Sequence, residues 1–140
     1  MRASAETVLL APVADAWRFA TEPHLLASWW PGIAALIPDQ LGLTADACWE
    51  VRRIARPRLF RKAAAAEEQL RVRAVEEHRL FAWQLTGQRI ECTLRLTPLS
   101  EARTQATLTV TGAALAGVTR SLAKVALGRL HALCQTGADL

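Results

Sequence analysis

The chain of 140 residues has few of the residues that cross-link a small protein. It contains three cysteines and no tyrosine. Cys48, Cys92 and Cys134 are odd in number, widely spaced and without a Cys-x-x-Cys pair, which argues against a disulfide framework and against a zinc site. We expect the cysteines to be reduced packing residues, and we expect neither a metal nor another cofactor.

Long apolar runs are also missing. No run approaches the ~18 residues of a membrane-spanning helix, and the N-terminus lacks the basic stretch and following apolar stretch of a secretory signal. We therefore expect a cytoplasmic protein without a membrane span. With 51% hydrophobic residues, residues 1–140 are sufficient for one domain with its own core.

The motifs of common catalytic sites are absent as well. The sequence has no Gly-x-Ser-x-Gly, no phosphate-binding glycine loop and no His-Glu-x-x-His. The three histidines fall on predicted polar faces or turns. Four charged residues have outward strand parity, and a register slip would turn them inward: Glu50, Arg52, Arg73 and Glu91. An acid or base among them stays open, and we nominate no catalytic residue.

The formal net charge of +4 is compatible with an anionic partner, such as nucleic acid or an anionic surface. One basic cluster lies within residues 52–62, whereas the later arginines alternate with acidic, apolar and threonine residues, as on solvated strand faces. Interleaved aromatic residues and known nucleic-acid-binding modules are missing. We therefore expect no nucleic-acid partner.

Residues 11–32 predict two short helices separated by a proline. Pro12 can open a helix, because the first turn offers no partner for the N–H that proline lacks. Pro23 ends the first helix and starts the second. Apolar residues recur at helical spacing in both helices: Val13, Ala16, Trp17, Ala20, Leu25, Leu26 and Trp29. We expect Trp17 and Trp29 to lie in the core.

After residue 32 the pattern changes to the alternation of half-buried antiparallel strands. The alternating segments are residues 48–52, 80–85, 90–96 and 106–111. Residues 86–88 and 98–103 supply turns between neighbouring strands.

The last predicted element is a helix over residues 115–135. At about 100° per residue, six apolar residues share one arc: Val118, Leu122, Val125, Ala126, Leu130 and Leu133. Arg129 falls inside this arc and is expected to project toward the sheet or a cavity mouth. It either reaches water near the helix end or anchors a carboxylate or enolate of a bound molecule.

Two motifs resemble the START-like superfamily, also called Bet v 1-like or SRPBCC, and within it the polyketide cyclase/dehydratase and Hsp90-activator-homology branches. The first runs Ala-Pro at 11–12, Val-x-x-x-Trp at 13–17, Glu-Pro at 22–23 and Leu-x-x-Trp-Trp at 26–30. The second, residues 75–83, is similar to the family's Val-x-Glu-x-Pro-x-Arg-Leu-x-x-x-Trp hairpin, slightly compressed and with His78 near the usual proline.

The resemblance implies an α+β helix-grip fold over residues 1–140. A curved antiparallel sheet of about six or seven strands would wrap around the long C-terminal helix, with two short helices after the first strand, in the order β-α-α-β-β-β-β-β-β-α. It requires strands within residues 61–70, although the alanine, glutamate and glutamine there favour helix. We side with strands, and a short helix at residues 63–69 is the alternative.

In such a fold the space between sheet and helix is a cavity where the function would reside. We expect its lining to include Trp30, Trp49, Val51, Phe81, Trp83, Leu94, Leu122, Val125 and Arg129. The three tryptophans among these residues either line a pocket for a flat apolar ligand or fill the interior.

Three classes of function follow. The leading one binds a small hydrophobic molecule, aromatic or polyketide-like, and as a cyclase or dehydratase would hold it folded and exclude water. The second is a carrier or sensor of a lipid or small molecule, without turnover. The third is a protein-interaction module of the Hsp90-activator kind, with a filled interior and an exposed apolar patch. The sequence does not identify the ligand, and it leaves open whether the ligand is converted and whether the protein forms a homodimer.

Overall fold

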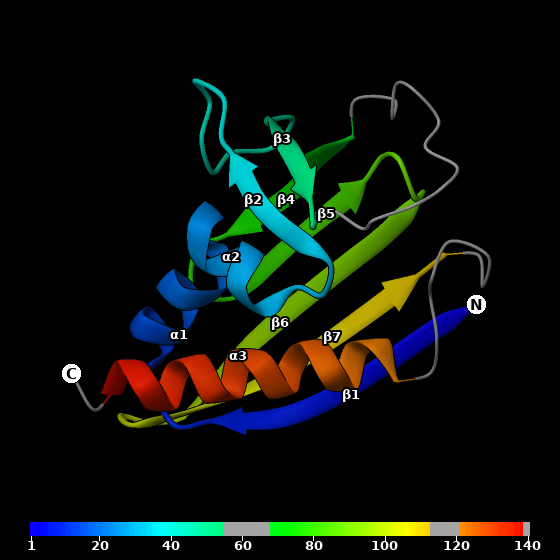
Figure 1. The fold of residues 1–140 in the computed structure, drawn as a ribbon. Helices are drawn as coiled ribbons and strands as arrows, with labels where there is room; N and C mark the ends of the chain where they lie inside the picture. Colours follow the sequence, from blue (N-terminus) through cyan, green and yellow to red (C-terminus); the bar gives the residue numbers. More distant parts are fainter. Residues whose placement is uncertain (55–67, 113–120, 139–140) are drawn as a thin grey trace.

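A curved, seven-stranded antiparallel sheet forms the frame of the computed structural model, which describes residues 1–54, 68–112 and 121–138 (Figure 1). The strand order is β1-β7-β6-β5-β4-β3-β2. The elements, in chain order, are β1 (Arg2–Leu9), α1 (Val13–Thr21), α2 (Pro23–Trp29), β2 (Ile33–Ile37), β3 (Cys48–Arg53), β4 (Gln69–Glu76), β5 (Leu80–Leu85), β6 (Ile90–Ser100), β7 (Arg103–Thr111) and α3 (Leu122–Ala138). The helix-grip order predicted from the sequence is confirmed.

The break between α1 and α2 follows the two prolines. Pro12 caps α1, and its carbonyl accepts the N–H of Ala16 at 2.9 Å. Glu22 is extended because it precedes Pro23, and it ends α1 while Pro23 takes a first-turn position of α2. Trp30 is again extended and ends α2. The predicted pair of short helices is confirmed.

The strands also follow the sequence pattern. The four predicted strands lie within β3, β5, β6 and β7, although β6 and β7 extend further toward each other than expected and leave a turn of only Glu101 and Ala102. Irregularities of register occur in β2, β4 and β6, and such bulges bend strands and increase their twist. Of the ambiguous stretch, residues 69–70 are strand in β4, and residues 61–67 lie outside the described residues.

Helix α3 lies along β1 on one face of the sheet, with α1 and α2 near its C-terminal end (Figure 1). It contacts β1, β7, α1 and α2. It begins at Leu122, and the part predicted at residues 115–120 lies outside the described residues. None of the helices in the described ranges is long and apolar enough to cross a membrane.

The buried face of α3 differs from the predicted arc. The side chains that face the interior are Ala123, Ala126, Leu127, Leu130 and Cys134. Val125 is 45% exposed, so its predicted place on the buried arc is wrong. Arg129 is also exposed, which contradicts its projection toward the sheet and agrees with the alternative in which it reaches water. Ala126 and Leu130 of the predicted arc are buried as expected. Because the helix is apolar over much of its circumference, its packing against β1 rather than apolar character alone decides that Leu127 is buried and Val125 is not.

The inner face of the sheet changes in side-chain size from the central strand β5 to the edge strand β1. One cross-strand row runs from Phe81 through Leu94 and Leu108 to Ala5. The neighbouring row runs from Trp83 through Cys92 and Val110 to Ala3. Large rings therefore lie at β5, and alanines at β1, where α3 packs.

Candidate ligand-binding site

Six buried rings gather on the inner face of the sheet. This aromatic cluster consists of Trp17 from α1, Trp29 and Trp30 from the end of α2, Trp49 from β3, and Phe81 and Trp83 from β5. Phe81 and Trp83 stack at 4.8 Å between centroids. Trp83 meets Trp29 and Trp30 edge to face, at 6.0 and 5.6 Å. The cluster thus joins the sheet to α1 and α2.

Strand alternation and two indole hydrogen bonds fix these rings. Phe81 and Trp83 share a face because they are two residues apart in β5. Trp29 Nε1 donates to the carbonyl of Ala20 at 3.3 Å, and Trp49 Nε1 donates to the carbonyl of Gly42 at 2.8 Å. The first bond ties α2 to α1, and the second ties β3 to the preceding loop.

The loop that supplies the Gly42 carbonyl is organised by Asp39. Its carboxylate accepts backbone N–H bonds from Cys48 at 2.8 Å, Leu41 at 3.0 Å and Gly42 at 3.2 Å. These bonds hold the pKa of Asp39 below its usual value, because they favour the charged carboxylate. The bond from Cys48 has the largest effect. Asp39 therefore positions Trp49 through the loop.

Trp83 differs from Trp29 and Trp49. Its side chain is fully buried, and within the described residues its Nε1 has no hydrogen-bond partner. Its cross-strand neighbours are Val72 and Cys92, which carry no oxygen in their side chains. A buried donor without an acceptor costs about 1–3 kcal/mol.

Most residues of the predicted pocket lie on the inner face. Trp30, Trp49, Phe81 and Trp83 are brought together in the aromatic cluster, and Leu94 pairs with Phe81 across the strands. Val51 is buried on β3, and Leu122 is half-buried on α3. Their role in binding stays a prediction.

Two predicted pocket residues face away. Val125 and Arg129 are exposed on α3, as described above, so the interpretation of Arg129 as an inward anchor for an acidic group loses its geometric basis. The rings of β5 contact Trp17 of α1 and Trp29 and Trp30 at the end of α2, whereas the predicted cavity lies between the sheet and the C-terminal helix.

A pocket of about 220 Å³ does lie between the sheet and α3, at the edge formed by β1. It is lined by Ala5, Glu6, Thr7, Lys124, Leu127 and Gly128, none of which was predicted. The space exists because Ala5 has a small side chain and Gly128 has none, and a Cβ atom placed on Gly128 would meet no atom within 4 Å beyond its chain neighbours and its own helix backbone. A glycine inside a predicted helix was the available sequence signal.

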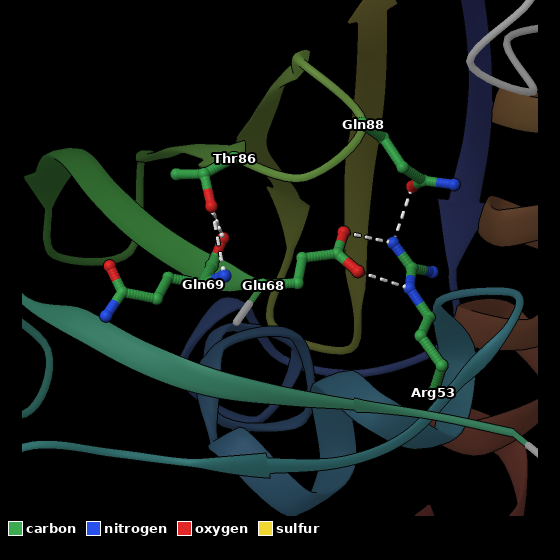
Figure 2. Close-up of polar contacts among 5 residues, drawn as sticks. All are labelled: Arg53, Glu68, Gln69, Thr86 and Gln88. Carbon is green, nitrogen blue, oxygen red and sulfur yellow. Dashed lines mark hydrogen bonds and ion pairs between the residues drawn. The ribbon is translucent and has the colours of Figure 1, made fainter. Parts of the chain in front are cut away.

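A polar cluster that the sequence did not predict lies at the C-terminal end of β3, around Arg53 (Figure 2). Arg53 Nε donates to Glu68 Oε2 at 2.7 Å, and Arg53 Nη2 bonds both Glu68 Oε1 and Gln88 Oε1. Gly87 is required beside it, because a Cβ atom there would lie 2.8 Å from Glu68 Cγ. Since the carboxylate is held by an arginine in bidentate fashion, we assign this Arg53 clamp to structure rather than proton transfer.

Two of the cysteines are buried and inert. Burial raises the pKa of the Cys92 thiol well above its usual range, and burial, helped by the charge of Asp15, raises the pKa of Cys134 to about 12. All three cysteines are free, as predicted. In the described ranges, no group of three or more metal-ligating side chains comes together.

The comparisons with known proteins agree with this geometry. A family model described as "Polyketide cyclase / dehydrase and lipid transport" matches residues 1–138. No curated protein matches the chain.

Solved structures share the fold at low sequence identity. Protein NE0264 from Nitrosomonas europaea has a TM-score of 0.72 and 15% identity, over 100% of this chain and 97% of that one. The Aha1 dimer from Colwellia psychrerythraea has a TM-score of 0.62 and 13% identity, over 94% and 93%. A point mutant of Thalictrum norcoclaurine synthase, in complex with a transition-state analogue, has a TM-score of 0.61 and 14% identity, over 99% and 96%. On the fold and the family match together, the chain belongs to the polyketide cyclase/dehydrase and lipid transport family of the Bet v 1-like, or START-like, superfamily.

Proposed function

We propose that this protein binds a small, neutral, ring-containing hydrophobic molecule against the aromatic cluster, between β5 and the end of α2. The observation that carries the proposal is the cluster itself, in which Trp83 is in ring contact with Phe81, Trp29 and Trp30. Such rings offer both faces and edges to a further flat ring. The family's description, which includes polyketides and lipids, supports the same class of ligand.

The buried polar groups favour a neutral guest. The buried polar side chains in the described ranges are Thr21 and Thr104. Each donates its hydroxyl to a carbonyl of the chain, Thr21 to Trp17 at 2.8 Å and Thr104 to Ala11 at 2.9 Å. A charged group brought into this interior would lose its hydration without gaining an opposite charge.

The proposal concerns binding, and a family activity such as cyclisation or dehydration would follow it. Holding a reactive chain against flat rings and away from water is itself a means of promoting ring closure. A carrier uses the same contacts without conversion. The two are separated by incubating the protein with a reactive linear polyketide analogue and measuring product formation above the uncatalysed rate.

The test of binding uses the neutral fluorescent probe N-phenyl-1-naphthylamine. We expect a saturable fluorescence rise with the wild-type protein, and about fivefold weaker binding by Phe81→Leu, which keeps an apolar side chain but removes a ring. Gly128→Leu is the matched control, because it fills the pocket at β1 and leaves the cluster untouched. Thermal unfolding of each variant checks that the fold is retained.

Two outcomes would overturn the proposal. One is the absence of saturable binding by the folded wild-type protein. The other is loss of binding in Gly128→Leu with full retention in Phe81→Leu, which would move the site to the seam between β1 and α3.

A further inference from the structure

We propose that the indole N–H of Trp83 is the recognition group of this site, and that it donates a hydrogen bond to the carbonyl oxygen of a bound, flat ring ketone. This inference rests on the proposed function. It names the ligand class that the site prefers, a neutral aromatic ketone over the hydrocarbon of the same shape.

The first support is that other buried donors of the interior already have acceptors. Trp29 Nε1, Trp49 Nε1 and the hydroxyls of Thr21 and Thr104 all donate to backbone carbonyls. Trp83 Nε1 is the exception within the described residues. Buried polar atoms in folded proteins are normally paired, so an unpaired one indicates a role that the chain alone does not fulfil.

The second support is the chemistry around Trp83. The ring stacks on Phe81 and meets the rings of Trp29 and Trp30. Ring faces are weak acceptors for an N–H group, and the neighbouring Cys92 is a protonated thiol, also a weak acceptor. A carbonyl oxygen brought here would therefore be a better acceptor than these rings or this thiol.

The third support concerns charge. A carboxylate would also accept this hydrogen bond, but no buried cation stands ready for it in residues 1–54, 68–112 and 121–138: Arg129 is exposed, and the Arg53 guanidinium is held by Glu68 and Gln88. A ketone supplies the acceptor without a buried charge. The ring part of the guest would occupy the aromatic faces, and its oxygen the indole donor.

The test compares 1-tetralone with tetralin, which share a skeleton and differ by one carbonyl. Each is titrated into the 15N-labelled full chain, and the indole N–H signals are followed by 1H–15N NMR, with Trp83→Phe identifying the Trp83 signal. We expect the ketone to bind about tenfold more tightly than the hydrocarbon. We also expect it to move the Trp83 signal downfield, whereas tetralin leaves that signal without a downfield shift.

Substitution then removes the donor. In Trp83→Phe the preference for the ketone should fall to within about twofold while tetralin still binds. Trp49→Phe is the matched comparison, because its indole already donates to Gly42. Both affinities are free to change there, but the ratio between ketone and hydrocarbon should be retained.

The outcomes separate this inference from the proposed function. If neither probe binds, the proposed function fails and this inference with it. If both bind equally and the Trp83 signal does not respond to the ketone, the inference is overturned and the proposed function stands. Should Trp83→Phe not fold, the infrared carbonyl stretch of tetralone bound to the wild-type protein decides: a stretch as in cyclohexane overturns the inference, and a stretch shifted to lower frequency supports it.

Discussion

The aromatic cluster and the seam between β1 and α3 are two opposite ways of packing the same face of one sheet. At β5 two neighbouring cross-strand rows begin with the rings of Phe81 and Trp83, and α1 and α2 cover them with further rings. At β1 the row of Phe81 ends in Ala5, and α3 packs closely over it, leaving a pocket of about 220 Å³. The contrast teaches that large residues bring elements together through ring contacts, whereas small ones let backbones approach and leave gaps.

The largest effect should come from breaking the ring side. Phe81→Ala removes a fully buried ring that contacts Trp17, Trp49 and Trp83, and we expect the free energy of unfolding to fall by about 3–5 kcal/mol. Urea unfolding followed by circular dichroism measures this. A loss below about 1 kcal/mol would mean that the cluster is not a packed unit.

A smaller effect of opposite sign is expected at the seam. Gly128→Ala places a methyl group in open space and raises helix propensity, so we expect a gain of about 0.5–1 kcal/mol in the free energy of unfolding. Ala126, on the same helix but fully buried, supplies the contrast. Ala126→Leu should destabilise the fold by about 1–3 kcal/mol through overpacking, and equal effects at both positions would contradict the assigned face of α3.

Asp39 links the ring side to pH. Its pKa in the folded state lies below its ordinary value of 3.8, so its stabilising contribution is complete above that value and is lost as the pH falls through the folded-state pKa. We therefore expect Asp39→Asn to unfold at a lower urea concentration than the wild type at pH 7. The difference should shrink in strongly acidic solution, as unfolding curves between pH 7 and pH ~2 would show. A difference that persists unchanged at the acidic end would contradict this role.

The smallest effect is expected at Arg129. Because the side chain is exposed on α3, Arg129→Ala should change the free energy of unfolding by less than about 0.5 kcal/mol. It should also leave the binding of the neutral naphthylamine probe unchanged. A large loss in either measurement would restore the inward orientation that the helical wheel predicted.

Much of the fold was predictable because its signals are local. Pro12 and Pro23 act on their own residues and immediate neighbours, and they produce the two short helices where the sequence places them. Alternation in β5 put Phe81 and Trp83 on one face, since strand period is a property of the backbone. Four of the predicted pocket residues are consequently found together in the aromatic cluster.

The errors arose where the decisive partner is distant in the sequence. The helical wheel placed Val125 on the buried arc and left Leu127 off it, but the approach of α3 to the alanines of β1 buries Leu127 and exposes Val125. Arg53 and Glu68 are 15 positions apart in the sequence, and no short-range pattern predicts the bond between them. The covering of the β5 rings by α1 and α2 likewise depends on contacts between segments far apart in the sequence.

By itself, then, the sequence determined the order and type of the elements, the family resemblance and the inward parity of the large rings, because each depends on neighbouring residues. Only the tertiary structure decided which face of α3 is buried, where space remains at β1, and that the buried Nε1 of Trp83, unlike those of Trp29 and Trp49, has no hydrogen-bond partner among the described residues. These features depend on distances between segments remote along the chain, and such distances are set when the sheet and helices pack.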